Sequence, residues 1–455
     1  MLIIKQIKNM ITLEEILSKA NDTKACIICK GAGEKTPEIF KELFPNKPAV
    51  VVADANTFKA QGATINEILK NAGIETSEPI IFTDPDLSGD WKYLEQLEER
   101  LKGTENIPVA VGSGVINDLC KLASEHLERR YIIIGTAISM DGYTSYGASL
   151  SFQGNKQTFQ CKAPLAVLLD PDIAANAPEG LAASGYADLL AKVPAGAEWM
   201  IADALDKDKI DDVTWDIMHS RLKASLSSPA AVKARDPEAT KELAELLMFS
   251  GFAMQHLQSS RPASGIEHIY SHLWDMENLN INGKHIPHGF KVGIGTLIST
   301  ASLEFLINYD FSTIDIDKCI EKWPTWEEME KKIISLTSFH DVLLKRCLKE
   351  GKDKYSTKDE VRGELNLFIK KWPELKQKLS NQILPFDTIK QNLITVGAPY
   401  EPEMINVSRE YLRSSYRIIP YMRSRFTTID LVNRLGLLDK LEDYLFGNHG
   451  PFEIK

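Results

Sequence analysis

Three histidines stand close together in residues 259–295. His268 and His272 are four residues apart, so on a helix they would lie one turn apart on the same face, and His288 follows Pro287 where we expect the next helix to start. Neutral imidazole is a good ligand for a divalent metal, and one helical turn spans a coordination shell. The spacing predicts a metal site; histidines in an interface between helices are the alternative that spacing leaves open.

A glycine turn stands in VAVGSGVINDLCKLA (109–123), which reads as a strand, a tight turn and a helix that starts near Val115. Gly112, Ser113 and Gly114 would let the backbone approach a pyrophosphate, and the helix start offers N–H groups and a positive dipole end. The turn geometry alone also requires glycine, so a dinucleotide site and a purely structural turn both stay open.

Two other expected strands also end in polar residues. Asp54 closes AVVVAD, where a carboxylate can bind an adenosine ribose and repel a 2′-phosphate, which favours NAD over NADP; an ordinary turn is the alternative. In IIIGTAISMDGYTSYGAS (132–149), small hydroxyls and one carboxylate directly follow a strand and could bind a cofactor or substrate, although a hydrophilic loop would read similarly. These side chains are Thr136, Ser139, Asp141 and Ser145.

Another carboxylate, Asp188, lies in EGLAASGYADLLAKVPAG, an otherwise apolar segment of small residues that predicts a helix. A buried carboxylate is costly unless it is paired or binds a metal. Asp188 is therefore a candidate functional residue.

Composition limits the classes of protein that fit. The chain has 455 residues, which suggests two or three domains, and its net charge of −10 argues against nucleic acid or an acidic membrane as partner. The N-terminal stretch is interrupted by Lys5 and Lys8, and we expect no membrane span, hence a cytoplasmic protein. Cys26 and Cys29 form a CxxC motif, but a buried strand explains it better than a metal or redox site.

The elements that must position these residues fall into two parts. Short, nearly continuous apolar runs alternate with amphipathic stretches over residues 1–170, which predicts a doubly wound, mostly parallel α/β sheet of the Rossmann-like type. From 171 to 455 helical periodicity dominates, and we expect a helical second domain. The charged stretch 349–364 is interpreted as solvated surface. The expected strands are ACIIC (25–29), AVVVAD (49–54), PIIFTD (79–84), VAVGSG (109–114), YIIIGT (131–136) and AVLLD (166–170).

Five ordered segments together carry a family resemblance: GSGVINDLCK, GTAISMDGYTS, GYADLLAK, SRPASGIEHIYSH and HGFKVGIGT, followed by YMRSRFTTIDLVNRLGLL near the C-terminus. The chain resembles the metal-dependent, NAD-linked polyol dehydrogenases of the iron-containing alcohol dehydrogenase and dehydroquinate synthase superfamily. Within it, the likeness is greatest to bacterial sn-glycerol-1-phosphate dehydrogenases. Phe290, beside a predicted ligand, departs from the polar residue that relatives often carry.

The resemblance assigns roles to matching positions. It makes Asp188, His268 and His288 the metal ligands, and it turns His272, together with Asp141 and Asp188, into catalytic contacts of the substrate. Asp54 matches the ribose-binding acid less securely. The matching dinucleotide contacts are Gly114, Val115, Ile116, Asn117, Asp118, Thr136, Ala137, Ile138, Ser139 and Ser145.

The implied reaction is reversible hydride transfer between NAD(H), with NADP as the alternative, and dihydroxyacetone phosphate or sn-glycerol 1-phosphate in a cleft between the domains. One divalent metal, zinc or nickel with iron(II) as a third option, suits nitrogen and oxygen ligands. Candidate phosphate-binding cations are Lys162, Arg261 and Lys291, and a homodimer or larger homo-oligomer is expected. The alternatives are a dehydrogenase of an uncharged polyol such as glycerol, a dehydroquinate-synthase-like lyase and a non-catalytic binding protein.

Overall fold

The computed structural model describes residues 11–153 and 155–454, which form two compact units. The first contains the residues up to Leu189 together with 212–262 and 395–397, and the second contains 190–211, 263–394 and the residues from Ala398 onward. The sheet-bearing unit is thus larger than residues 1–170 because a helical segment of later sequence packs into it. The expected cleft between domains stays a prediction, and Lys5 and Lys8 lie outside the described residues.

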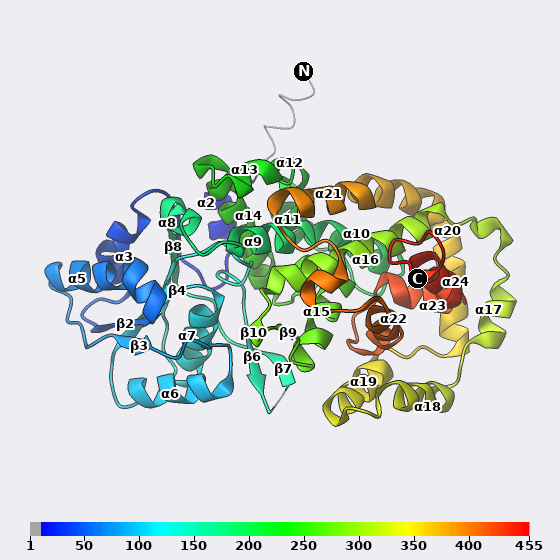
Figure 1. Cartoon of the computed structure of the whole chain (residues 1–455), viewed down its shortest axis with the longest axis horizontal. Coiled ribbons are helices and arrows are strands. Elements are labelled where there is room, and N and C mark those ends of the chain that lie inside the picture. Colours follow the sequence, from blue (N-terminus) through cyan, green and yellow to red (C-terminus); the bar gives the residue numbers. More distant parts are fainter. Residues whose placement is uncertain (1–10, 154, 455) are drawn as a thin grey trace, which may run out of the picture. The chain divides into compact units, whose positions relative to one another are not determined.

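A six-stranded parallel sheet forms the centre of the first unit, in the order β1-β8-β5-β4-β2-β3. Figure 1 labels β2, β3, β4 and β8 of this sheet. Each of the six expected strands is present, so the predicted fold class is confirmed. The strands are β1 (Ala25–Ile28), β2 (Ala49–Asp54), β3 (Ile80–Phe82), β4 (Ile107–Gly112), β5 (Ile132–Gly135) and β8 (Ala166–Leu169).

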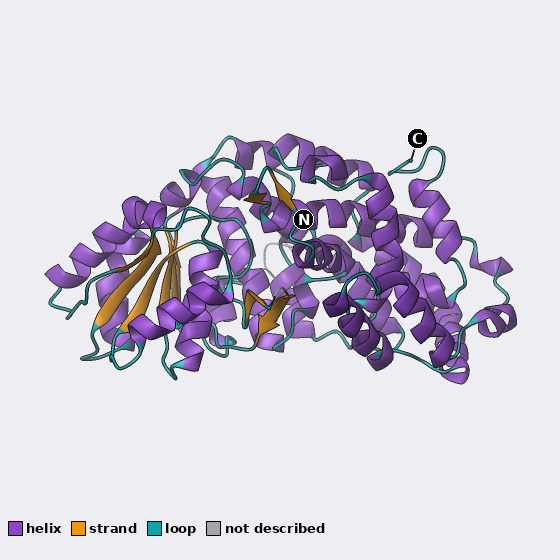
Figure 2. Ribbon diagram, turned by 60° about the horizontal axis from the view of Figure 1, so that its bottom comes forward, coloured by secondary structure: helices purple, strands orange, loops and turns teal. Residues whose placement is uncertain are grey.

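The strands are continuously apolar because helices cover both faces of the sheet (Figure 2). Val51 packs into a core with Phe40 of α3 (Thr36–Leu43) and Ile65 of α5 (Ala63–Asn71), while α7 (Gly114–His126) also contacts β4 and β2. Successive residues such as Val50 and Val51 point to opposite faces, and both are at most 1% exposed.

The strand register aligns the carboxyl ends of the central strands. Ala53 pairs with Val111, and Gly112 pairs with Gly135, so the residues that follow β2, β4 and β5 emerge at the same edge. Ligands of open α/β sheets bind at this edge. The sheet thus gathers the candidate residues near positions 54, 112 and 136.

A hairpin that the sequence did not predict follows this edge, with β6 (Ala148–Phe152) antiparallel to β7 (Asn155–Phe159). Its strands are short and rich in hydroxyl and other polar residues, so they lack the apolar run that marked the central strands. Only alternate positions of β6, such as Ala148 and Leu150, are fully buried.

The segment 212–262 is tied to the sheet by Gln255 of α14 (Pro237–Leu257). Its side-chain Nε2 donates to the backbone oxygen of Thr144 at 2.8 Å, and its Oε1 accepts from the backbone N–H of Asp22 at 2.7 Å. The remaining helices of this unit are α2 (Leu13–Ser18), α4 (Ala55–Thr57), α6 (Trp91–Leu101), α8 (Pro171–Ala175), α9 (Leu181–Leu190), α11 (Asp212–His219), α12 (Leu222–Ser225) and α13 (Pro229–Lys233).

The second unit is helical, as predicted, apart from a pair of two-residue strands, β9 (Asn280–Ile281) and β10 (Lys284–His285). Its helices are α10 (Lys192–Ala204), α15 (Ile266–Met276), α16 (His288–Asn308), α17 (Ile316–Lys322), α18 (Trp326–Thr337), α19 (Asp341–Asp353), α20 (Lys358–Gln382), α21 (Phe386–Val396), α22 (Arg409–Ile418), α23 (Thr428–Arg434) and α24 (Leu438–Phe446).

One expectation about this unit needs correction, and one helix bears on another expectation. Among the described residues, α16 is long and apolar enough to cross a membrane by length and composition, but 83% of its apolar window is buried in the protein, as in a core helix. The charged stretch 349–364 is not simply solvated surface, because Ser356 is 5% exposed and Glu364 is 8% exposed. Glu364 pairs with Arg434 at 2.8 Å, and this contact draws the stretch inward.

Candidate active site

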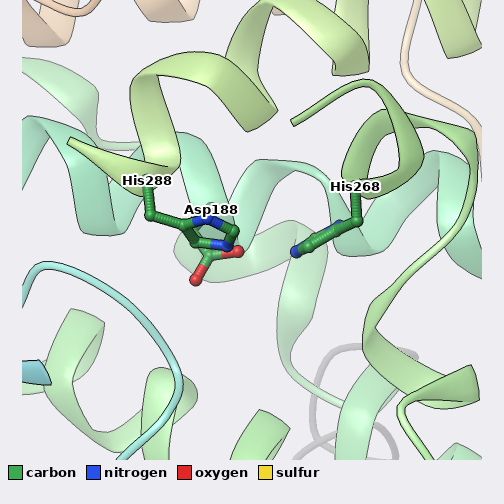
Figure 3. A group of neighbouring side chains, drawn as sticks. All are labelled: Asp188, His268 and His288. Atoms are coloured by element: carbon green, nitrogen blue, oxygen red, sulfur yellow. The ribbon is translucent and has the colours of Figure 1, made fainter. Parts of the chain in front are cut away.

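Asp188, His268 and His288 converge on one point (Figure 3). They project from α9, α15 and α16, and one ligand atom of each lies within 4.8 Å of those of the other two. The imidazole ring centroids of His268 and His288 are 5.4 Å apart. The structure therefore brings together the three residues that the family resemblance assigned to the metal.

The sequence around Asp188 explains its position. A Cβ atom at Gly185 would collide with the backbone oxygen of Ile138, so glycine lets α9 approach the loop after β5 closely. Ser184 donates its hydroxyl to the backbone oxygen of Ser139 at 3.0 Å, and the backbone N–H of Asp141 donates to Asp188 Oδ2 at 3.1 Å. Asp188 is 0% exposed. Small residues thus allow a buried carboxylate to meet the loop that carries Asp141.

A buried glutamate orients His268. Glu267 is 0% exposed, and its Oε1 lies 2.9 Å from Nδ1 of His268 while it also accepts the backbone N–H of Gly265. This contact assigns the proton to Nδ1 and leaves Nε2 as the nitrogen that could bind a metal. The sequence analysis did not predict a role for Glu267. A charged residue at a core-facing position of the predicted helix could have indicated one.

His288 is fixed by the close packing of α15 and α16. It is the first residue of α16, and its Nδ1 lies 3.4 Å from the hydroxyl of Ser271. Seven residues further on, a Cβ at Gly295 would lie 2.5 Å from the backbone oxygen of Glu267. Glycine is therefore needed there for the two histidine-bearing helices to approach each other.

His272 is not part of the three-residue cluster, and its contact explains why. Its Nε2 lies 3.3 Å from Nη2 of Arg423, and because a guanidinium can only donate, Nε2 must accept. Burial, followed by the nearby positive charges of Arg423 and Arg346, holds the pKa of His272 well below its usual value of 6.5. His272 is thus a neutral imidazole whose proton sits on Nδ1. In this geometry it is His268, and not His272, that lies with Asp188 and His288.

Asp141 lies directly beside the cluster, because its backbone N–H binds Asp188. Its own Oδ2 accepts the hydroxyl of Ser250 of α14 at 2.7 Å. The loop that carries it is held by Lys121, whose Nζ donates to the backbone oxygens of Ser145 at 2.8 Å and Gly147 at 3.0 Å. Lys121 is a second residue that sequence reasoning missed, since a lysine on an amphipathic helix reads as solvent-exposed.

At the carboxyl edge of the sheet, the turn from β4 to α7 has the predicted form. A Cβ at Gly112 would lie 2.6 Å from Cβ of Ile116, and the side chain of Ser113 makes no capping hydrogen bond to the first turn of α7. The backbone N–H of Thr136 donates to the oxygen of Gly112 at 3.1 Å, which joins the two predicted loops. An N-terminal turn of α7 beside Val115 is available to bind an anion.

The other predicted dinucleotide contacts occupy different environments. Asn117 is 0% exposed, and its amide bridges the hydroxyl of Tyr131 and the backbone oxygen of Gly142, so its side chain holds the fold together. Asp118 accepts the backbone N–H of Ser149, and burial raises its pKa. In the loop after β5, Ser139 is half-buried. The buried residues of this loop are Thr136, Ala137, Ile138 and Ser145.

Asp54 caps α4. Its Oδ1 accepts the backbone N–H groups of Asn56 at 2.8 Å and Thr57 at 3.0 Å. These contacts are those of an ordinary turn at a helix start, and a ribose contact stays a prediction.

The three candidate cations for a substrate phosphate lie in different environments. Lys291 pairs with Asp275, Lys162 is exposed and Arg261 is 2% exposed.

Comparisons with known proteins identify relatives of the chain. The family model for iron-containing alcohol dehydrogenases matches residues 27–178. The chain is 34% identical over 253 residues to the glycerol-1-phosphate dehydrogenase [NAD(P)+] of Halalkalibacterium halodurans, an alignment that covers 55% of this chain and 63% of the relative. It is 32% identical to the protein of the same name from Bacillus subtilis, with 58% and 68% covered. The chain thus spans less than two thirds of the first of these relatives.

Solved structures give the same fold. Glycerol dehydrogenase from Schizosaccharomyces pombe superposes with a TM-score of 0.58 at 15% sequence identity, covering 92% of this chain and 90% of that one. Sulfoacetaldehyde reductase from Bifidobacterium kashiwanohense, in complex with NAD+, superposes with a TM-score of 0.59 at 14% identity, covering 94% and 98%. With the family model and a 32% identical relative aligned over 68% of its length, the chain belongs to the iron-containing alcohol dehydrogenase family.

Proposed function

We propose that this protein is a metal-dependent oxidoreductase, linked to NAD(H) with NADP as the alternative, that interconverts dihydroxyacetone phosphate and sn-glycerol 1-phosphate. The names of the relatives support the substrate and the dinucleotide, and the family supports a divalent metal. The observation that carries the proposal is the convergence of Asp188, His268 and His288 to within 4.8 Å.

The three side chains fit one divalent ion. Metal–nitrogen and metal–oxygen distances of about 2.0–2.2 Å place two ligands of one ion at most about 4.4 Å apart, so the cluster needs only a small contraction. One carboxylate and two imidazoles, with no thiolate, suit zinc or nickel, and iron(II) is the third option. When bound, the ion supplies a Lewis acid for the ketone oxygen and the dinucleotide supplies the hydride.

The chain's own side chains handle the substrate's hydroxyls and proton. His272 is neutral, with Nε2 engaged by Arg423, and its buried Nδ1 finds no hydrogen-bond partner among the described residues. Its Nδ1–H can therefore donate to a substrate oxygen. Asp141, whose Oδ2 is held by Ser250, offers a carboxylate that orients a substrate hydroxyl. The Asp141 carboxylate can take up the proton that the alcohol loses, while the Nδ1–H of His272 donates a hydrogen bond to the oxyanion that forms.

For the dinucleotide, we assign the pyrophosphate to the turn 112–114 and to the first-turn amides of α7. The amides are not capped by Ser113, and glycine at 112 keeps the turn tight. Residues 115–118, 136–139 and Ser145 complete this side of the cofactor site. Asp54, at the end of β2, disfavours a 2′-phosphate by its charge, which makes NAD the preferred cofactor.

The direct test is NADH oxidation by the purified protein after removal of metal and reloading with zinc, nickel or iron(II). Dihydroxyacetone phosphate should give a higher kcat/KM than dihydroxyacetone in the preferred metal form. Equal values for the two ketones would instead identify a dehydrogenase of uncharged polyols. Conversion of a dehydroquinate precursor without net NADH consumption would identify a lyase, and the absence of turnover with all of them would leave a binding protein.

A further inference from the structure

A buried lysine of α7, Lys121, binds residues 141–147, which we call the substrate loop. Lys121 is 1% exposed, and its Nζ donates to the backbone oxygens of Gly142 at 2.9 Å, Ser145 at 2.8 Å and Gly147 at 3.0 Å. An ammonium group has three N–H donors, so these three oxygens use all of them. The lysine therefore acts on the loop and has no donor left for a ligand.

The burial of this charge is costly, and no ion pair compensates for it at close range. The carboxylate of Asp118 lies 4.0 Å from Nζ, too far for a hydrogen bond, so the loop carbonyl groups carry most of the compensation. An apolar side chain would fill a core position of α7 without this cost, as Cys120 and Leu122 do, both at most 1% exposed. The cost favours a role for Lys121 beyond packing.

Side chains from two helices set the path of the substrate loop. Its residues form neither a helix nor a strand, so side-chain donors must satisfy carbonyl groups that regular structure would otherwise satisfy. The amide of Asn117 donates to the oxygen of Gly142 at 3.1 Å, and the amide of Gln255 donates to the oxygen of Thr144 at 2.8 Å. Lys121 binds three carbonyl groups of the loop, more than either amide does.

The substrate loop begins with Asp141, the proposed substrate contact. Gly142, the next residue, provides one of the oxygens that Lys121 binds, so the lysine holds the peptide unit beside Asp141. The backbone N–H of Asp141 donates to Oδ2 of the proposed ligand Asp188 at 3.1 Å, and Asp141 Oδ2 accepts the hydroxyl of Ser250. A shift of the loop would therefore displace the carboxylate that orients the substrate.

The other end of α7 carries the turn to which the pyrophosphate is assigned. Lys121 lies seven residues after Gly114, the first residue of α7, which is about two turns or 10 Å along the helix axis. One helix thus joins the dinucleotide turn to the substrate loop, and all of these residues belong to the first unit. Hydride transfer requires the two reacting carbons to approach to about 3–3.5 Å, so a small error in this connection is costly.

Resting on the proposed function, we infer that Lys121 is a positioning residue for hydride transfer. Its ammonium group fixes the substrate loop relative to α7 and thereby places Asp141 and the substrate against the dinucleotide. Loss of the ammonium group should slow the chemical step, while the turn at the start of α7 keeps its affinity for the pyrophosphate.

The experiment compares Lys121→Met with Arg129→Met and wild type, all loaded with the preferred metal. Methionine is nearly as long as lysine but has no N–H donor. Arg129 is the matched control, because it also donates to backbone oxygens of a loop, at Asn106 (2.7 Å) and Thr104 (3.1 Å), but that loop precedes β4 at the opposite edge of the sheet. The measurements are the single-turnover rate of NADH oxidation by dihydroxyacetone phosphate, the Kd of ADP-ribose and the thermal unfolding temperature.

In Lys121→Met we expect the single-turnover rate to fall on the order of 10- to 100-fold, as for a misplacement of the reacting groups, with an unchanged Kd of ADP-ribose. In Arg129→Met only the unfolding temperature should fall. A wild-type rate in Lys121→Met would overturn the inference. An equal fall in rate in Arg129→Met, or a parallel weakening of ADP-ribose binding in Lys121→Met, would also overturn it, because Lys121 would then only stabilise the fold.

A second variant, Lys121→Arg, carries the test if Lys121→Met does not fold. Arginine keeps a buried cation but spreads its donors over a longer, planar group, so the loop must shift to meet them. The single-turnover rate should fall about 10-fold with an unchanged Kd of ADP-ribose, and a wild-type rate would contradict the inference.

Failure of the proposed function has a different signature. If wild type reduces dihydroxyacetone as fast as its phosphate, the substrate assignment is wrong, and the variants are compared with dihydroxyacetone instead. If wild type reduces neither ketone, amide hydrogen exchange of the metal-free protein tests the positioning itself. The hydrogen-bonded N–H groups of Asp141 and Gly147 should exchange faster in Lys121→Met but not in Arg129→Met, and unchanged exchange at both positions would refute the inference.

Discussion

Replacing Glu267 by alanine tests how the predicted metal ligand His268 is oriented. Glu267 is fully buried, and its carboxylate holds Nδ1 of His268 at 2.9 Å together with the backbone N–H of Gly265. Without it, the ring can turn and two buried donors lose their acceptor. Removal of such an outer partner typically weakens metal binding about 10- to 100-fold, or about 1.4–2.7 kcal/mol.

The assay is competition for zinc with a chromophoric chelator, with thermal unfolding of the metal-free protein measured alongside. The metal-free variant should also lose about 1–3 kcal/mol of stability, because Gly265 N–H stays buried. Glu267→Gln keeps an acceptor oxygen and should lose less affinity than Glu267→Ala. Glu374→Ala, on the exposed surface of α20, is the control. If Glu267→Ala binds zinc as tightly as wild type, the reasoning about His268 is refuted.

Three further predictions concern packing, cofactor choice and pH. Gly295→Ala would place a Cβ 2.5 Å from the backbone oxygen of Glu267, so the free energy of unfolding should fall by about 1–3 kcal/mol in thermal unfolding. Gly363→Ala, with open space around it, is the control and should stabilise α20 by up to about 1 kcal/mol. Asp54→Ser keeps a helix cap but removes the negative charge. The kcat/KM with NADPH, divided by the kcat/KM with NADH, should rise roughly 10-fold, and no rise would refute the ribose role. Burial lowers the pKa of His219 from 6.5 to about 3, so below pH 6.5 the unfolded state binds a proton that the folded state does not. The free energy of unfolding should therefore fall as the pH falls, by at most about 1.4 kcal/mol per pH unit. Denaturant titrations should show a flatter pH dependence for His219→Gln, and an unchanged slope would contradict the assignment.

The elements that follow from local pattern were predictable. Strands such as β2 and β5 are apolar at every buried position, because both faces of the sheet are covered, and that pattern is visible in AVVVAD and YIIIG. The glycine turn at 112–114 was predictable for the same reason, since its geometry depends on adjacent residues. Asp188 was recognisable because a carboxylate among small apolar residues demands a partner.

What could not be predicted depends on contacts between distant parts of the chain. His272 reads as a ligand from its spacing to His268, and only Arg423, 151 residues later, explains its neutral state and its different role. The packing of 212–262 with the sheet rests on Gln255, whose partners lie more than 100 residues away. The charged stretch 349–364 is drawn inward by Arg434, which no local pattern reveals.

The division of roles between His268 and His272 is the central claim, and metal content measured together with turnover tests it most directly. His268→Ala should lose bound metal, because one of three ligands is gone. His272→Ala should keep wild-type metal content while kcat falls roughly 100-fold or more, as for the loss of a hydrogen-bond donor to a developing oxyanion. Equal loss of metal in both variants would contradict the account and restore His268 and His272 as a ligand pair.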